Sequence, residues 1–386
     1  MEVTEALNAS SSTNNTPVDR QLADIYAIHN PGQAAVDKYV TPIIYILGFP
    51  GNILAFLVWI GKRMRHSSGC YLAALALSDL MFMALHVLFE LVNVWNMAIL
   101  DVPIICEMYA VFFLWSQYYS PLLVLGFTVE RYISICHPFR REKLCTTRRA
   151  VIVIILLCLL SLGLCAIQGY FLMYDYNQQI CTMRKSVTDG GVESVWSIWT
   201  WVTEMLIFLL VPVVVLGVNI RVIKEARRIG REESMRSLKG TPRKNSATTL
   251  MLLAVSFYLI VTTLPVSIMY ALNYSFLEGR LSMTDEEIEN DVTWQQHFAY
   301  LQARAVIQEI GLTHYACNFY IYCITGKIFR GELCKMIAFV RCKAWSKGGM
   351  LGEHTRYYST AETTVALNTC TTANGRSTQS TPETSV

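Results

Sequence analysis

Long apolar stretches recur along the chain and alternate with short polar ones. At about 1.5 Å of helical rise per residue, each stretch exceeds the roughly 30 Å of hydrocarbon in a bilayer. A segment inside a bilayer has to be helical, because no water is present to satisfy an open backbone. The pattern predicts an all-α membrane protein, a seven-transmembrane helix bundle. The seven stretches lie at about residues 40–61, 70–97, 106–136, 150–173, 195–223, 247–274 and 295–325.

Composition supports a membrane protein. The chain is 53% hydrophobic and only 16% charged, whereas soluble domains carry about 25% charged residues. A net charge of +3 gives no reason to expect bulk electrostatic binding, for example to nucleic acid. The twelve cysteines contain no CxxC pair, which argues against a zinc site and against a dense disulfide scaffold.

The polar segments indicate the orientation. Lysine and arginine gather in the loops after the first, third and fifth apolar stretches, whereas the loop before the seventh is acidic, with Asp285 and Glu286 among its residues. Positive loops face the cytoplasm. We therefore expect residues 1–39 to form an extracellular tail at the plasma membrane. Two glycosylation sequons, at Asn8 and Asn14, agree with this orientation.

The chain beyond the last apolar stretch has two parts. Residues 326–340 are amphipathic at helical spacing, which predicts a short eighth helix on the inner membrane surface. Cys334 and Cys342 lie in or beside it and are candidate palmitoylation sites, with unmodified thiols as the alternative. Residues 341–386 are rich in Ser and Thr, and we expect them to be disordered.

Several residues inside the apolar stretches match, in order, the motifs of a known receptor family. The chain resembles a rhodopsin-like (class A) G-protein-coupled receptor over about residues 40–340. The resemblance implies a receptor that activates a heterotrimeric G protein, and not an enzyme. The matching residues are Gly51-Asn52, Asp79 in LALSD, Cys106, the triplet Glu130-Arg131-Tyr132, Pro212, Pro265, and Asn318 with Tyr322.

The resemblance also assigns roles to residues in the spans. Polar residues inside apolar helices are costly to bury without partners, and those expected to surround a structural sodium ion are Asp79, Asn52, Ser120 and Asn318. A hydrogen-bonded polar core without an ion is the alternative. The residues expected to act as the activation switch and to couple to the G protein are Glu130, Arg131, Tyr132, Pro265, Asn318 and Tyr322.

Two pairings follow from the same resemblance. Arg131 is expected to pair with Glu130 at rest and to reach the G protein on activation. Cys106 and Cys181 are expected to form a disulfide outside the membrane, where oxidising conditions allow one.

The chain departs from the family pattern at several positions. Thr263 replaces the usual tryptophan before Pro265, Phe319 replaces the proline after Asn318, and Asn245 stands where many relatives have an acid. These departures predict an altered switch and raised basal activity. Asn-Phe-x-x-Tyr-Cys followed by Gly-Lys-x-Phe-Arg is similar to invertebrate neuropeptide receptors, including the FMRFamide and myosuppressin group.

Two ligand classes are argued against. Phe113 stands where amine receptors have an aspartate, and Leu312 stands where opsins have a Schiff-base lysine. Charged side chains at membrane depth are candidates for function. We therefore expect an extracellular neuropeptide whose cationic group meets Glu90 or Glu204; the alternative is an internal pair between Arg304 and Glu90 or Glu309. The candidate ligand-binding residues are Glu90, Phe113, Gln117, Glu204, Arg304 and Gln308.

The sequence also allows two alternative functions and indicates further partners. A receptor for a non-peptide small molecule is the nearest alternative. A membrane transporter is a more distant one, because no repeats or broken half-helices are visible. The Ser/Thr-rich tail after Ser359 predicts receptor kinases and arrestin as partners, and the C-terminal Thr-Ser-Val ending at Val386 fits a PDZ domain.

Overall fold

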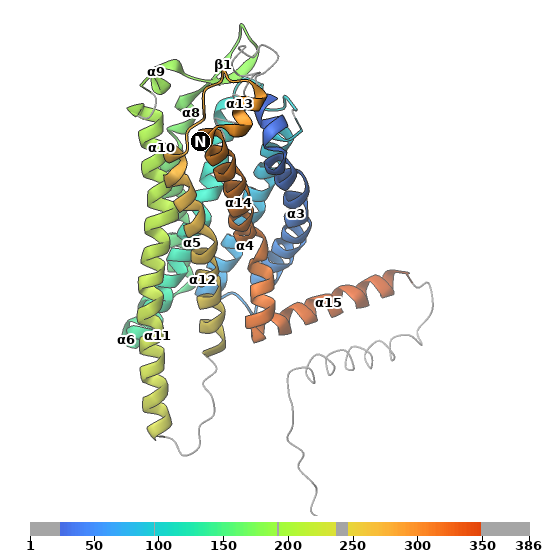
Figure 1. The fold of residues 1–386 in the computed structure, drawn as a ribbon. Helices are drawn as coiled ribbons and strands as arrows, with labels where there is room; N and C mark the ends of the chain where they lie inside the picture. Colours follow the sequence, from blue (N-terminus) through green and yellow to red (C-terminus); the bar gives the residue numbers. More distant parts are fainter. Residues whose placement is uncertain (1–23, 96, 191–192, 237–245, 349–386) are drawn as a thin grey trace, which may run out of the picture.

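The computed structural model describes residues 24–95, 97–190, 193–236 and 246–348. Long helices run side by side from one end of the molecule to the other (Figure 1). Within the described residues these are α3 (Pro31–Trp59), α4 (Ser67–Asn93), α5 (Ile105–Cys136), α7 (Thr147–Cys165), α10 and α11 (Val195–Met205 and Val211–Arg236), α12 (Ser246–Leu272) and α14 (Val292–Thr325).

Shorter elements lie at the two ends of the bundle. The β-strands, α9 and α13 lie at one end and α6 at the other, where α15 leaves the bundle at a steep angle (Figure 1). These elements are α6 (Pro138–Leu144), α8 (Gln168–Phe171), β1 (Leu172–Asp175), β2 (Ile180–Met183), α9 (Lys185–Thr188), η3 (Asn273–Ser275), α13 (Asp285–Asn290) and α15 (Lys327–Gly348).

α5 is the innermost long helix. In its most apolar stretch 72% of the residues are buried, against 17% in α7, and α5 packs against α4, α7, α11 and α12. α7 is nearly all Ile, Leu and Val and leaves large side chains exposed, such as Ile155 and Leu159. An apolar surface of this kind suits contact with lipid.

Six helices within the described residues are long and apolar enough to cross a membrane, and α14 is not one of the six. The reason lies in its sequence, which places Arg304, Gln308 and Glu309 in the middle of 34 helical residues. α14 nevertheless packs along α3 and α12. It is therefore the seventh helix of the predicted bundle, with its polar side chains directed inward, where Glu309 is buried.

Prolines shape the fifth and sixth apolar segments. Between α10 and α11 the helix widens into a π-helical turn, η2 (Leu206–Leu210), just before Pro212. A proline has no N–H for the usual bond four residues back, and a π-bulge absorbs such a break. Ser267 lies two residues after Pro265 in α12. Its Oγ donates a hydrogen bond at 2.5 Å to the carbonyl of Phe208 in this turn.

The loop between α8 and α9 folds into a hairpin that the apolar pattern did not predict. β1 and β2 are antiparallel, with Tyr174 opposite Cys181. The predicted disulfide between Cys106 and Cys181 is present. Two carboxylates also hold the hairpin. Asp101, in the loop before α5, accepts through Oδ1 from the backbone N–H of Cys181 at 2.9 Å, and Glu107 of α5 accepts through Oε1 from that of Tyr174 at 3.2 Å.

Helical structure extends beyond the predicted boundaries. A short helix occupies residues 24–29, and α3 begins at Pro31, within the segment predicted to be an extracellular tail. α15 covers nearly all of residues 326–340, where the sequence predicts an eighth helix, and continues to Gly348, into the segment predicted to be disordered. An eighth helix on the membrane surface stays a prediction. Asn8, Asn14 and Val386 lie outside the described residues.

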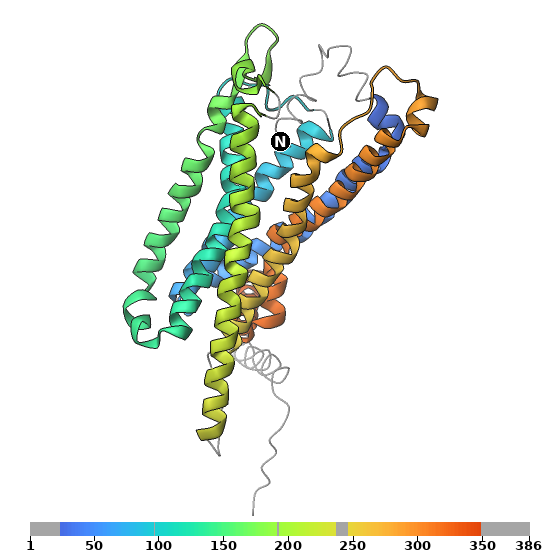
Figure 2. The ribbon, with the colours of Figure 1, turned by 60° about the vertical axis from the view of Figure 1, so that its left-hand side comes forward.

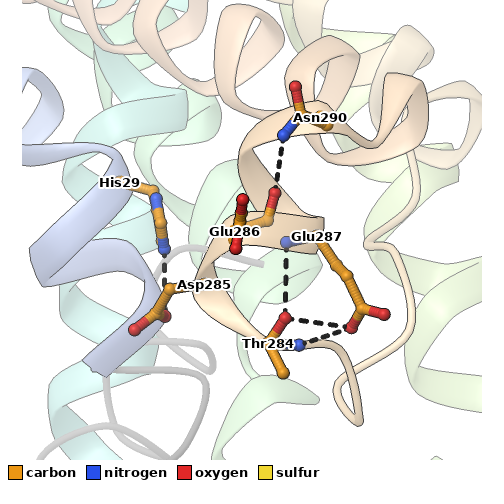
Figure 3. A network of polar contacts seen from close by, with 6 residues as sticks. All are labelled: His29, Thr284, Asp285, Glu286, Glu287 and Asn290. Carbon is orange, nitrogen blue, oxygen red and sulfur yellow. Dashed lines mark hydrogen bonds and ion pairs between the residues drawn. The ribbon is translucent and has the colours of Figure 1, made fainter.

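The N-terminal helix (residues 24–29) lies beside α13 and the outer end of α14 (Figure 2). α13 begins with a capping box, in which Thr284 and Glu287 satisfy each other's backbone N–H. His29 Nε2 lies 3.2 Å from Asp285 Oδ1 and so joins the N-terminal helix to α13 (Figure 3).

Candidate functional site

A pocket lies among the outer parts of α4, α5, α10, α12 and α14. Its volume is about 120 Å³, whereas one water needs roughly 10–15 Å³ by the same measure. The pocket can therefore hold a substantial part of a ligand. Five of the six predicted ligand-binding residues line it: Phe113, Gln117, Glu204, Arg304 and Gln308.

The pocket contains charged side chains of both signs. Glu204 on α10 accepts a hydrogen bond from the Tyr118 hydroxyl of α5 at 2.8 Å. Arg304 on α14 donates to the side-chain oxygen of Asn273 at 3.4 Å. A ligand in this pocket would therefore meet a carboxylate from one helix and a guanidinium from another.

Glu90, the sixth predicted ligand-binding residue, does not line this pocket. Its Oε1 lies 3.9 Å from Nδ1 of His86, one helical turn away on α4, and His86 is the residue that lines the pocket. The same nitrogen is 2.5 Å from the Tyr45 hydroxyl of α3. Glu90 thus belongs to a polar layer behind the pocket wall.

Glu309 accepts a hydrogen bond from Thr41 of α3 at 2.5 Å.

The predicted sodium-site residues lie deeper in the bundle and are fully or almost fully buried. Asp79 Oδ1 accepts from Ser120 Oγ at 2.7 Å, and Asp79 Oδ2 accepts from Asn318 Nδ2 at 2.8 Å. Asn52 does not bind Asp79 directly. Its Nδ2 donates to the backbone carbonyls of Gly48 and Tyr315, at 3.1 and 2.7 Å.

The residues of this cluster suit a hard cation such as sodium. The side-chain oxygens of Asn52 and Asn318 are buried without a hydrogen-bond partner, as is the hydroxyl of Tyr322. Buried polar atoms normally have partners, and oxygen ligands match a hard cation. Asp79, Ser120 and Asn318 would hold such an ion, which would neutralise the buried carboxylate; the site stays a prediction.

The inner end of α5 shows a different connection from the expected pair of Glu130 and Arg131. Glu130 Oε1 accepts hydrogen bonds from the hydroxyls of Ser67 and Ser68 at the start of α4, the latter at 3.0 Å. Arg131 donates through Nη2 to the same Ser68 hydroxyl. The described contacts therefore link the acid to the base through Ser68. A hydroxyl can do this because it donates and accepts at once.

Two other predicted switch residues, Tyr322 and Tyr132, also pack at this end. The buried ring of Tyr322 lies edge-on to Trp59 of α3 at 5.5 Å and 5.4 Å from Phe329 of α15. Tyr132 is half-buried and edge-on to His137. The cavity that Arg131 lines has a volume of only about 10 Å³, which is roughly the space of one water.

Two titratable groups outside the spans, His66 and Cys145, have pKa values shifted by this buried region. Burial lowers the pKa of His66, in the loop before α4, and the nearby Arg131 lowers that pKa further. Burial also raises the pKa of the Cys145 thiol, and Glu130 adds to the rise. Both groups therefore favour their neutral forms beside the inner end of α5.

The structure adds pocket residues that the sequence did not single out, among them Tyr300, Asn273 and Ser267. Tyr300 could have been found, because it precedes Arg304 by four residues, as Arg304 precedes Gln308, and this spacing places all three on one helix face. Asn273 and Ser267 could not, since their place in the pocket depends on how α12 packs against α10 and α14.

Comparison with known proteins agrees with this architecture. The profile of the 7 transmembrane receptor (rhodopsin family) matches residues 51–304. The chain is 26% identical to Probable G-protein coupled receptor 34 of Pan troglodytes, over 56% of this chain and 57% of that protein. It is 27% identical to Neuromedin-U receptor 2 of Homo sapiens, over 56% and 54%, and 26% identical to Growth hormone secretagogue receptor type 1 of Rattus norvegicus, over 77% and 79%.

The match to the first of these relatives spans little more than half of that protein's length. The family profile, in contrast, covers most of the bundle, from the middle of α3 to the pocket residue Arg304. The predicted resemblance is thereby confirmed at the level of the family. The chain belongs to the rhodopsin family of 7 transmembrane receptors.

Proposed function

We propose that this multi-pass membrane protein binds an extracellular neuropeptide and activates a heterotrimeric G protein. The observation that carries the proposal is the outer pocket with Glu204 and Arg304 in its wall. A peptide offers both a cationic group for the carboxylate and carbonyl or carboxylate oxygens for the guanidinium. Members of this family are receptors and not enzymes, as the sequence predicted.

Two further observations support the proposal. Two of the relatives are named for neuromedin-U and for growth hormone secretagogue. The pocket and the Arg131 region lie in the same bundle. The buried cluster around Asp79 lies in α4, α5 and α14, and α4 and α5 contribute both to the pocket and to the contacts of Arg131. We place the N-terminus outside the plasma membrane and the Arg131 end at the cytoplasm. The FMRFamide and myosuppressin group is the subfamily whose ligands we would test first.

The expected regulatory partners belong to the same proposal. Cys334 is a half-buried residue of α15 and is a proposed palmitoylation site. Three other predicted features lie outside the part of the chain that the structure describes. They are the side chain of Cys342, the Ser/Thr-rich segment after Ser359 proposed to meet receptor kinases and arrestin, and the proposed PDZ ligand ending at Val386.

The test is a signalling assay in cells that express the full chain at the surface. Calcium and cAMP are recorded against a neuropeptide library that includes amidated peptides. We expect one peptide family to activate the receptor and Arg131→Ala to abolish the response. Responses to lipids or other small molecules, with none to peptides, would replace the peptide by the alternative ligand class.

A matched pair of variants tests the pocket itself. Glu204→Lys reverses the charge inside the pocket, and Glu289→Lys makes the same change on the exposed surface of α13. We expect a loss of peptide potency of about tenfold or more for Glu204→Lys, since a charged hydrogen bond contributes about 1.5–3 kcal/mol, and little change for Glu289→Lys. Equal potency of both variants would remove Glu204 from the binding site.

A further inference from the structure

Outside the membrane spans, the N-terminal helix (residues 24–29) is fixed to the end of the bundle. A small apolar cluster holds it there, in which Ile25, Ile288 and Trp294 are buried. Trp294 is fully buried and stacks on Phe298 with 5.2 Å between ring centroids. The helix is thus packed against α13 and the outer end of α14 by the same apolar burial that forms a small core.

His297 on α14 connects three segments at this place. Its Nδ1 lies 2.8 Å from the backbone oxygen of Phe276, which follows η3. Because a carbonyl can only accept, Nδ1 donates this hydrogen bond. Its Nε2 lies 3.0 Å from the hydroxyl of Tyr26 in the N-terminal helix. One imidazole therefore joins the N-terminal helix, the segment after α12, and α14.

The contacts continue from Phe276 to the pocket. The ring of Phe276 stacks on Tyr300 with 5.1 Å between centroids and 10° between planes. Tyr300 donates to the backbone oxygen of Met269 at 2.8 Å and also lies 3.2 Å from Oδ1 of Asn273. The same Oδ1 accepts from Arg304 at 3.4 Å. Tyr300, Asn273 and Arg304 all line the pocket.

We propose that Tyr26 and His297 are positioning residues for Arg304, so that the N-terminal helix sets the placement of the guanidinium in the ligand pocket. The proposal rests on the proposed function only in treating this pocket as the ligand site. An arginine side chain has about 2 kcal/mol of rotamer entropy to lose. A wall already ordered through Tyr300 and Asn273 reduces that loss when a ligand binds.

The chain of contacts also identifies the informative substitution. Tyr26→Phe keeps the ring, which stacks on His297 and lies edge-on to Phe298. It removes only the hydroxyl, which meets His297 and also donates to Glu278 Oε1 at 3.1 Å. His297→Phe removes both imidazole hydrogen bonds and is the stronger variant. Tyr176→Phe is the matched control, because Tyr176 is an exposed residue in the turn between β1 and β2.

The test measures the charge in the pocket without a ligand or a G protein, so its outcome is separate from that of the signalling assay. Gln308→Cys places a thiol in the pocket one helical turn from Arg304. Intact cells are treated with the anionic sulfonatoethyl methanethiosulfonate or with the cationic trimethylammonioethyl methanethiosulfonate, and with a neutral analogue to verify that the pocket is open. The readout is the ratio of the anionic to the cationic modification rate.

We expect a ratio that favours the anionic reagent, and its loss in an Arg304→Gln background. Tyr26→Phe should lower the ratio by about fivefold, the effect of one hydrogen bond, and His297→Phe should lower it at least as much. Tyr176→Phe should leave it unchanged, and the neutral reagent should react at the same rate throughout. A ratio that is indifferent to Tyr26→Phe and His297→Phe would overturn the proposal, as would one indifferent to Arg304→Gln.

Discussion

The two ends of the bundle differ in the open space around their charged residues. The outer pocket encloses about 120 Å³ beside Glu204 and Arg304, and the inner cavity beside Arg131 encloses about 10 Å³. The outer end therefore has room for part of a ligand with the helices where they are. An inserted protein segment at the inner end would require the helices to separate, because Tyr322 is packed between Trp59 and Phe329.

The comparison teaches that binding and response use different physical means. The outer end offers polar groups around a space that already exists, so its specificity depends on side chains. The inner end is closed by aromatic packing and by the link from Glu130 through Ser68 to Arg131. We propose that activation at the inner end is a shift between two packings of the helices.

The largest effect is expected on removal of the disulfide, and this effect should be confined to the outer end. Replacing both Cys106 and Cys181 by serine should cost about 2–4 kcal/mol of stability and loosen the hairpin over the pocket. Amide exchange should rise in β1 and β2 and stay unchanged near Arg131. The control Cys158→Ser removes a free thiol of α7. An equal rise at both ends would show that they do not behave separately.

Asp79 gives the next effect, because it lies between the two ends. Asp79→Asn should lower the free energy of unfolding by about 1 kcal/mol, because it weakens the hydrogen bonds from Ser120 and Asn318. If sodium binds there, the melting temperature of the unmodified protein should rise when NaCl replaces choline chloride, and Asp79→Asn should abolish that response. Asp101→Asn, which changes an outer carboxylate bound to Cys181, should keep it. An unmodified protein indifferent to sodium would favour the ion-free polar core.

Ser68 sharpens the description of the inner end. Ser68→Ala removes the hydroxyl that contacts both Glu130 and Arg131, whereas Ser67→Ala removes one that contacts Glu130. Losing one hydrogen bond should shift the closed state toward the open one by about fivefold. Basal signalling should therefore be higher in Ser68→Ala than in Ser67→Ala. The opposite order would mean that Ser68 does not restrain Arg131.

The smallest effect is expected outside the bundle, at α13. Glu287 has a pKa below its ordinary 4.5, because it accepts hydrogen bonds from the backbone N–H of Thr284 and then from its hydroxyl. A lowered pKa gives stability that is present above the ordinary value and is lost as the pH falls through the lowered one. Amide exchange in α13, corrected for its intrinsic pH dependence, should rise below pH 4.5. Glu287→Gln should show no such pH dependence.

Much of the fold could be predicted because apolar length and charge distribution are local properties. The seven helices and the disulfide between Cys106 and Cys181 follow from the sequence and its family resemblance. The helix before α3 and the β1–β2 hairpin were missed. Both depend on residues that are distant in the sequence. The helix packs against Trp294, and the hairpin is bound by Asp101.

Five of the six predicted ligand-binding residues line the outer pocket for a similar reason, and their role in binding a ligand stays a prediction. A charged residue inside an apolar helix needs a polar environment, so Glu204 and Arg304 could be selected by type and depth alone. Glu90 met the same criterion and lies behind the wall, because His86 one turn away occupies the position on the pocket. Which of two neighbouring polar residues faces a cavity depends on helix rotation, and a pattern of residues does not determine it.

The sequence by itself determined that this chain is a helical membrane bundle and a member of its family, because the cost of exposing backbone or charge to lipid acts on each segment separately. Only the tertiary structure decided that Ser68 stands between Glu130 and Arg131, and that Tyr26 reaches Arg304 through His297, Phe276 and Tyr300. Such contacts join residues up to some 270 positions apart, as Tyr26 and His297 are. They exist only once packing has brought the helices together.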